Sequence, residues 1–286
     1  MSAKVELIHT RGQLRAALEP KRNEGQVALV MTMGALHEGH LDLIRRAHEL
    51  AQTVVVSIFV NPLQFAPGED FDTYPRTLDA DLEKIASAGN AIVFAPAAED
   101  VFPGGAPSVT LDPGPVGRVL EGATRPTHFA GVLQIVAKVM NLVGPDFALF
   151  GQKDAQQLAI VKQMVRDLDM PLEVVPVPIR REPDGLAMSS RNRYLSETER
   201  ETALTLSRAL EAGREAAATA KLPSAVLSAA TRAMDVPGVK LDYVALVDPL
   251  SFAPVEDGVT GTAVLAVAAW VGKTRLIDNA LVVVGR

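Results

Sequence analysis

The sequence predicts an α/β fold, a Rossmann-like doubly wound parallel sheet followed by a smaller C-terminal α+β domain. Short, continuously apolar runs such as TVVVSIFV at 53–60 are typical of strands buried on both faces of a parallel sheet. These runs alternate with segments whose apolar residues recur at helical spacing. Alternation of this kind is the pattern of βαβ units.

The alternating segments fill the first 179 residues. Strands are expected at 26–33, 53–60, 90–96, 147–151 and 172–179. Helices are expected at 39–52, 77–89, 129–144 and 153–169. Thr77 is the expected N-cap of the second helix, and Gly89 is expected to end it. The Pro- and Gly-rich stretch 103–117 is expected to be irregular.

The pattern changes after residue 180. Ser196 and Glu199 have the spacing of a capping box, which starts a helix over 197–220. A further helix is expected at 223–235, and strands are expected at 240–248, 262–271 and 274–284. The sequence therefore predicts two domains, 1–179 and 180–286.

The composition narrows the class of protein. The chain has 286 residues, of which 48% are hydrophobic, enough for a large core. Its formal net charge of -6, without blocks of Lys and Arg, argues against a nucleic-acid partner. It has no cysteine, which excludes disulfides and thiolate metal sites. No secretory signal or membrane span is visible, so a cytoplasmic protein is expected.

The stretch MTMGALHEGH at 31–40 joins an expected strand to an expected helix. Ligands bind at the carboxyl ends of strands in a doubly wound sheet, and a helix N-terminus there favours phosphate. His37 and His40 are three residues apart and share a helix face. This arrangement predicts a nucleotide triphosphate site. The alternative is one surface histidine and one that bonds a carbonyl.

Two further polar groups follow strands. Lys153 comes directly after the strand ending at Gly151, and Gln157 lies four residues on and shares its face. Asn61 and Gln64 follow the strand at 53–60, and their amides suit a small hydroxy acid. The alternatives are a solvated helix start for the first group and turn-capping amides for the second.

These motifs together resemble a known family. GALHEGH resembles the HIGH signature of the class I aminoacyl-tRNA synthetase and nucleotidyltransferase superfamily, and AMSSRN at 187–192 stands where its KMSKS loop stands. The stretches SIFVNPLQF, YPRT, LEGATRPTHFAGV, FGQKDAQQL and DGLAMSSRNRYL, with RLIDN near the C-terminus, resemble the pantothenate synthetase (pantoate–β-alanine ligase) family. The resemblance covers essentially the whole chain.

The resemblance implies the reaction and its partners. ATP and (R)-pantoate would give pantoyl adenylate and pyrophosphate, and β-alanine would then attack the adenylate to give (R)-pantothenate and AMP. Mg²⁺ would be carried mainly by the ATP phosphates, without a metal site on the protein. A homodimer is implied by the resemblance alone. The apolar run 53–60 could serve a dimer edge or the core.

The resemblance also implies roles for individual residues. His40 would be the proton donor, with His37 and Lys153 as further catalytic residues. Gln64, Gln157 and Asn61 would bind pantoate or β-alanine. The ATP site would comprise Met33, Gly34, Ala35, Leu36, His37, Glu38, Gly39, His40, Gly151, Gln152, Lys153, Asp154, Arg180, Met188, Ser189, Ser190 and Arg191. The last four form the expected mobile loop of a C-terminal lid domain.

Two positions differ from the family's usual pattern, Met31 in place of proline and Gln152 in place of glutamate. Arg125 and His128 match a family motif, but a role in the site and a structural role stay open. His9 and His48 match no motif and are expected at the surface or in packing. Two other functions stay open, another nucleotidyltransferase of the superfamily and a protein that only binds the nucleotide.

Overall fold

The computed structural model describes residues 4–285. The chain divides into two compact units. The first comprises residues up to 152 together with 160–178, and the second comprises 153–159 together with the residues from 179 onward. No helix among residues 4–285 has the length and apolar character needed to cross a membrane.

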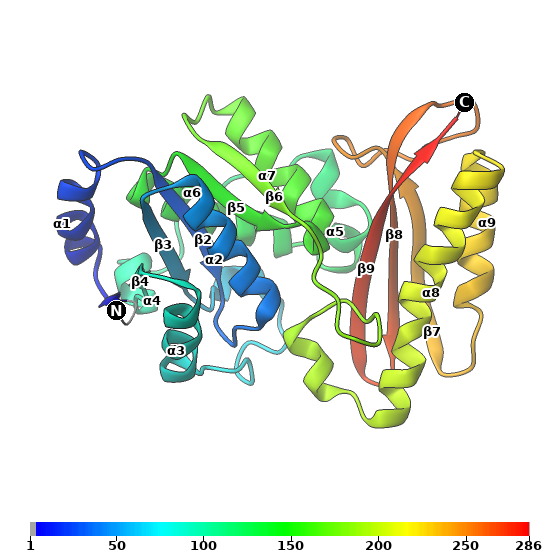
Figure 1. Cartoon of the computed structure of the whole chain (residues 1–286), viewed down its shortest axis with the longest axis horizontal. Helices are drawn as coiled ribbons and strands as arrows, with labels where there is room; N and C mark the ends of the chain where they lie inside the picture. The colour runs from blue at the N-terminus through cyan, green and yellow to red at the C-terminus, as the bar shows by residue number, and fades with distance from the viewer. Residues whose placement is uncertain (1–3, 286) are drawn as a thin grey trace. The chain divides into compact units, whose positions relative to one another are not determined.

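The first unit contains a six-stranded, all-parallel sheet, which confirms the predicted parallel arrangement and adds one strand to the five that were expected. Its spatial order is β1-β4-β3-β2-β5-β6 (Figure 1). The strands are β1 (Val5–Ile8), β2 (Val27–Thr32), β3 (Thr53–Ile58), β4 (Ala91–Phe94), β5 (Phe147–Gly151) and β6 (Glu173–Val177). The strand order reverses between β2 and β5, which is where doubly wound sheets bind ligands.

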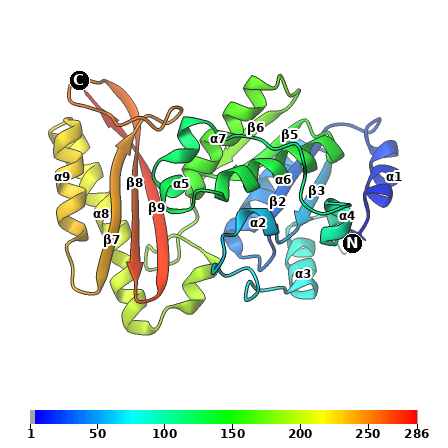
Figure 2. The ribbon, with the colours of Figure 1, turned by 180° about the vertical axis from the view of Figure 1, so that it is seen from behind.

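Helices cover both faces of this sheet (Figures 1 and 2). On one face α2 packs against β2, β3 and β5 and against α3, and on the other α6 packs against β2 and α1. The helices are α1 (Arg11–Lys21), α2 (Glu38–Leu50), α3 (Leu78–Ala88), α4 (Ala98–Val101), α5 (Glu121–Thr124), α6 (His128–Val143) and α7 (Ala155–Asp167). The 3₁₀ helices are η1 (Pro62–Gln64), η2 (Pro115–Arg118) and η3 (Gln152–Asp154).

The central strands are buried because helices lie on both sides of them. Residues 53–57 of β3 are all buried, and β3 lies between β2 and β4 rather than at an edge of the sheet. The apolar run at 53–60 therefore belongs to the core of its own unit. This burial explains why apolar residues run consecutively from Val54 to Val56 instead of alternating with exposed polar ones.

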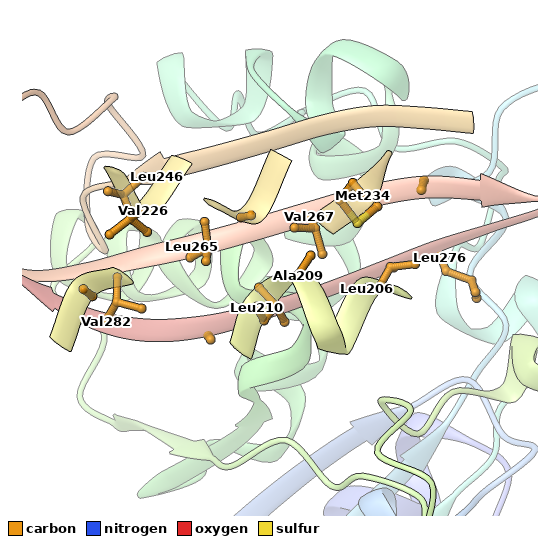
Figure 3. Packing of buried hydrophobic residues seen from close by; sticks show 14 of the residues in the cluster. Leu206, Ala209, Leu210, Val226, Met234, Leu246, Leu265, Val267, Leu276 and Val282 are labelled. Carbon is orange, nitrogen blue, oxygen red and sulfur yellow. The ribbon is translucent and has the colours of Figure 1, made fainter. Parts of the chain in front are cut away.

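The second unit contains three antiparallel strands and two long helices. Strands β7 (Val239–Val247), β8 (Gly261–Val271) and β9 (Thr274–Val284) pair in that order, and α8 (Glu197–Thr219) and α9 (Pro223–Met234) pack against them. Figure 3 shows the apolar core between helices and strands, with Leu206 and Leu210 of α8 near Leu265 and Val267 of β8. The 3₁₀ helix η4 (Ser190–Tyr194) precedes α8.

Some expected elements differ in detail. The first strand and helix, β1 and α1, have no counterpart in the expectation. The helix expected over 153–169 begins at Ala155, because Gln152–Asp154 forms the separate turn η3. Thr77 stands at the N-cap position of α3, but it makes no side-chain cap. The Ser196–Glu199 capping box and the stop at Gly89 are confirmed.

Candidate active site

The turn between β2 and α2 carries the expected nucleotide signature. Gly34 has a φ of 86° and Ala35 a φ of 51°, so both lie in the left-handed region. A β-carbon on Gly34 would lie 3.2 Å from the carboxylate of Asp81 and 3.3 Å from Ile58, so a side chain has little room there. Alanine rarely adopts this conformation unless other contacts hold it. The conformation of this turn therefore needs a cause outside the turn itself.

Asp81 of α3 supplies that cause. Its carboxylate is fully buried and accepts hydrogen bonds from the backbone N–H groups of Ala35 at 3.0 Å and Leu36 at 2.8 Å. The hydroxyl of Thr77 donates to the same carboxylate at 3.1 Å, so Thr77 supports Asp81 and does not cap α3. Lys84, one turn further along α3, donates from Nζ to the Leu36 carbonyl at 2.7 Å. Helix α3 thus holds the signature turn in two ways: Asp81 accepts from the N–H groups of the turn, and Lys84 donates to its carbonyl.

His37 and His40 lie together at the start of α2. Their ring centroids are 4.0 Å apart with an interplanar angle of 28°. The His37 backbone N–H donates to Nδ1 of His40 at 3.3 Å. Because a backbone N–H can only donate, a neutral His40 carries its proton on Nε2. The arrangement therefore gives His40 an Nε2–H donor at the N-terminus of a helix.

Asn61 and Gln64 lie in and beside η1, which follows β3. The Asn61 amide nitrogen donates to Oε1 of Gln64 at 3.1 Å and to the carbonyl of Gly131 on α6 at 3.0 Å. Its oxygen accepts from the Leu63 backbone N–H at 3.3 Å, so the turn-capping interpretation of Asn61 is confirmed. Both amides are buried. Asn61 therefore fixes which end of the Gln64 amide is the oxygen and which is the nitrogen.

Gln64 reaches the nucleotide signature. With its oxygen bound to Asn61, its amide nitrogen Nε2 lies 3.1 Å from the sulfur of Met33. Met33 is half-buried and stands directly before Gly34 in the signature turn. The amide expected to bind the hydroxy acid and the turn expected to bind the nucleotide thus come together in the first unit.

Arg125 and His128 surround the backbone of Gln64. His128 Nδ1 lies 2.9 Å from the Gln64 carbonyl oxygen, and Arg125 Nη2 donates to the same oxygen at 3.3 Å. Arg125 also makes a two-point ion pair with Glu69 at 2.6 and 2.7 Å. Burial alone raises the pKa of Glu69. The hydrogen bond and charge of Arg125, the hydrogen bond from the Ala66 N–H and, when His128 is protonated, its charge outweigh burial and leave the pKa lowered.

Of the remaining expected site residues, Gly151 ends β5 and Gln152 begins η3 in the first unit, and the others belong to the second unit. Lys153 and Asp154 lie in η3, and Gln157 lies in the first turn of α7. Lys153 and Gln157 are half-buried, and Asp154 is exposed. The amide of Asn279 on β9 donates to the Lys153 carbonyl at 2.8 Å. Strand β9, which contains the RLIDN motif, therefore anchors the backbone of the expected phosphate lysine.

The expected mobile loop forms a short hairpin-like turn. The Met188 backbone N–H donates to the Arg180 carbonyl at 2.9 Å. Ser189 caps η4, because its hydroxyl oxygen accepts from the Arg191 backbone N–H at 3.3 Å. Residues 188–191 are all half-buried, while Arg180 is exposed. The cap holds Ser189 and Arg191 on the same short turn.

An ion pair supports the start of this turn. Arg181 binds the buried carboxylate of Asp278 on β9 at 2.7 and 3.1 Å, and it also donates to the Gly185 carbonyl at 3.1 Å. Asp278 shares the helix-facing side of β9 with Leu276 and Ala280, since side chains alternate along a strand. The buried charge on this apolar face is thus explained by its pairing with Arg181.

Several supporting residues have no place in the sequence-based site. Asp81 is typical of the acidic residues in the first turn of a helix, which complement the helix dipole. Asp278 and Asn279 are part of RLIDN, which carries no assigned role. His9 is exposed, with Nδ1 2.9 Å from the Ala95 carbonyl oxygen, and burial lowers the pKa of His48, as expected for surface and packing residues. Within residues 4–285, no three His, Asp or Glu side chains are grouped so as to hold a metal ion.

The comparisons with known proteins decide the family. The model of the family described as pantoate-beta-alanine ligase matches residues 6–281. The chain belongs to this family. It is 56% identical over 273 residues to the pantothenate synthetase of Thermobifida fusca, covering 92% of this chain and 91% of that protein. It is 54% identical over 277 residues to the enzyme of Salinispora arenicola, covering 96% of each.

Solved structures agree with the family at the level of the fold. The pantothenate synthetase of Thermus thermophilus superposes with a TM-score of 0.90 at 46% identity, covering 96% of this chain and 98% of that one. The pantoate-beta-alanine ligase of Francisella tularensis, described as complexed with beta-gamma ATP and beta-alanine, has a TM-score of 0.79 at 31% identity, covering 97% of each chain. The chain is thus an enzyme of the pantoate-beta-alanine ligase family, which joins pantoate to β-alanine.

Proposed function

We propose that the chain makes (R)-pantothenate in two steps, through a pantoyl adenylate. A carboxylate oxygen of (R)-pantoate attacks the α-phosphorus of ATP, and the bond to the bridging oxygen breaks to release pyrophosphate. The amine of β-alanine then attacks the acyl carbon, and AMP leaves with the bond electrons while the amine loses a proton. The observation that carries the proposal is the contact between Gln64 and Met33, because it joins an acid-binding amide to the nucleotide turn.

The first unit would bind the reacting ends of ATP and pantoate. Residues 33–40 approach the nucleotide, since the turn leads into the positive end of the α2 dipole. His40 donates from Nε2 to a phosphate oxygen, and His37 stacks on it and adds a second imidazole. Stabilising the charge that develops as pyrophosphate leaves is the largest contribution expected of such donors.

Pantoate would lie against Gln64. Because Asn61 binds the Gln64 oxygen, the amide offers its N–H donors, which match the carboxylate and hydroxyl oxygens of pantoate. The Asn61 amide is bonded to Gln64, Gly131 and Leu63, so its contribution to pantoate binding passes through Gln64. Gln157 supplies a further amide from the second unit.

The second unit would supply positive charge to the triphosphate. Lys153 is a flexible point charge, and Arg191 offers a planar fork of donors suited to phosphate. Ser189, Ser190 and Met188 complete the loop, and the unit acts as a lid. Gly151, Gln152, Asp154 and Arg180 contact the nucleotide. These roles follow from residue chemistry and from the match to the family's motifs.

We further propose that Mg²⁺ enters with ATP, that the enzyme is a homodimer, and that it works in the cytoplasm. The absence of cysteine suits a reducing compartment. Mg²⁺ is a hard cation that prefers oxygen ligands, and the ATP phosphates would supply them.

Pantoate-dependent exchange between ATP and labelled pyrophosphate, with Mg²⁺ and without β-alanine, tests the proposal. Exchange that requires pantoate supports the adenylate. His40→Ala should lower its rate about 100- to 1,000-fold, as loss of one preorganised donor does. His9→Ala is the control, because His9 is an exposed histidine whose ring bonds a backbone carbonyl. A folded enzyme that forms pantothenate without any pantoate-dependent exchange would contradict the adenylate.

A further inference from the structure

Gln64 is held by its backbone as well as by its side chain. Its carbonyl oxygen lies 2.9 Å from Nδ1 of His128 and accepts from Nη2 of Arg125 at 3.3 Å. His128 is the first residue of α6, and Arg125 is the C-cap of α5. Two side chains from outside η1 therefore converge on the peptide group of the residue whose amide faces Met33.

The partners of His128 determine its protonation. Nη1 of Arg125 lies 3.2 Å from Nε2 of His128, and a guanidinium has no acceptor, so Nε2 must accept. The Gln64 carbonyl has no donor, so Nδ1 must carry the hydrogen. The contacts are thus satisfied together only by a neutral ring with its proton on Nδ1.

Glu69 fixes Arg125 in the orientation that this arrangement needs. Its carboxylate accepts from Nε and Nη2 of Arg125 and also from the backbone N–H of Ala66 at 3.1 Å. The arginine and glutamate side chains are only 15% and 23% exposed, so this pair is better shielded than a surface ion pair. Two-point pairing of this kind restricts a guanidinium in both position and plane.

The close approach of α6 completes the support. A β-carbon on Gly131 would lie 2.1 Å from the Leu63 carbonyl oxygen, so α6 meets the η1 backbone where only glycine fits. His128 lies one turn before Gly131 on the same helix. Helix α6 therefore places the His128 imidazole against the Gln64 carbonyl and holds the η1 backbone close to the helix.

We propose that His128 and Arg125 are positioning residues, which hold the Gln64 peptide so that its amide meets pantoate. This inference rests on the proposed role of Gln64. It predicts that the hydrogen on Nδ1 of His128 is the feature that matters. Asparagine places its amide nitrogen near the position of Nδ1, whereas glutamine places its nitrogen near that of Nε2.

The test compares His128→Asn with His128→Gln in steady-state kinetics, with pantoate and ATP varied separately. His128→Gln should raise the KM for pantoate at least tenfold and leave the KM for ATP within about twofold. His128→Asn should keep the KM for pantoate much closer to that of the unsubstituted enzyme. Arg125→Lys should also raise the KM for pantoate, since an ammonium cannot bind Glu69 at two points and reach His128 as well. His9→Asn is the matched control.

The outcomes separate this inference from the role of Gln64. Gln64→Ala is measured in the same assay, and thermal unfolding is followed for every variant. An impaired Gln64→Ala enzyme with equal pantoate KM values for His128→Asn and His128→Gln overturns the positioning role alone. A Gln64→Ala enzyme with unchanged KM for pantoate overturns the role of Gln64 and the inference with it. Equal losses in the KM for pantoate and ATP would mean that His128 only stabilises the fold.

Discussion

The buried carboxylate of Asp81 makes a sharp prediction about the nucleotide turn. Asp81→Asn keeps the size of the side chain but replaces one oxygen with an NH₂ group, which cannot accept. Either the Ala35 or the Leu36 N–H, now bonded at 3.0 and 2.8 Å, must then face a donor. Because Asp81 is fully buried, water cannot replace the lost acceptor.

The size of the effect follows from these contacts. A hydrogen bond to a charged group contributes about 1.5–3 kcal/mol, and a buried donor left unsatisfied costs about 1–3 kcal/mol. Both figures include the loss of the same hydrogen bond, so they are not added in full. We expect Asp81→Asn to lower the free energy of unfolding by about 3 kcal/mol. For a chain of this length, at about 2 °C per kcal/mol, the midpoint of thermal unfolding should fall by roughly 6 °C.

Activity should fall together with stability. The left-handed backbone at Ala35 relaxes once its anchor is weakened, and this moves the turn that leads into His37. A displacement of about 1 Å in a positioned group can cost about 100-fold in rate, so pantoate-dependent pyrophosphate exchange should fall by about that factor at a temperature where the variant stays folded.

Asp79→Asn is the matched control, since Asp79 is an exposed carboxylate on the same helix. Both variants are followed by thermal unfolding and by the exchange assay. An Asp81→Asn enzyme that unfolds within about 1 °C of Asp79→Asn and exchanges at the same rate would refute the anchoring role, because the figures above require a loss of roughly 6 °C.

Three other perturbations test the packing around the candidate site. Gly131→Ala should destabilise the enzyme and raise the KM for pantoate, because its β-carbon would lie 2.1 Å from a carbonyl oxygen of η1. Gly12→Ala in α1 is the control, because its β-carbon meets only the Thr10 hydroxyl at 4.0 Å. This control should raise the free energy of chemical unfolding by about 0.5–1 kcal/mol. Glu69 has a lowered pKa in the folded state, so its ion pair stabilises above its unfolded pKa of about 4.3 and this contribution is lost as the pH falls through the folded value. Glu69→Gln should therefore flatten the acid limb of a plot of unfolding free energy against pH below about 4.3, and an unchanged limb would contradict the pairing. Arg181→Ala should lower the free energy of unfolding by about 3–5 kcal/mol, because it leaves the buried carboxylate of Asp278 without its ion-pair partner. The double variant with Arg181→Ala and Asp278→Ala should recover part of that free energy in a double-mutant cycle.

The sequence predicts the main elements of the fold because their buried positions carry apolar residues at the spacing of a strand or a helix. β3 has three consecutive buried valines, Val54 to Val56, because it is a central strand covered on both faces. β1 escapes prediction because it is a short edge strand in which only Ile8 is buried. α1 escapes because just Leu14 and Leu18 are buried and Pro20 lies inside its last turn. The strand order, with the reversal between β2 and β5, depends on contacts far apart in the chain and has no local signal.

In the candidate site too, the sequence identifies some residues and misses others. Motifs identify the residues that are expected to touch substrate, because such residues cluster on short turns after strands. The residues that hold those turns act from a distance in sequence: Asp81 is 45 positions from Leu36, and His128 is 64 positions from Gln64. Their residue types suit other roles equally well, so their function is visible only from the partners that they contact.

The supporting contacts share one chemical feature, which links stability to catalysis. Asp81 binds backbone N–H groups, and Lys84, His128 and Asn279 bind backbone carbonyls, so each acts on the main chain of an expected ligand-binding turn. A side chain that touches only substrate can be removed without loss of fold, whereas removing one of these anchors frees a backbone that the fold itself does not otherwise constrain. Substitutions at the ligands should therefore change activity with stability unchanged, and substitutions at the anchors should lower both together. The positive φ of Ala35 shows why: the conformation that presents the histidines costs free energy, and the buried hydrogen bonds of Asp81 offset that cost.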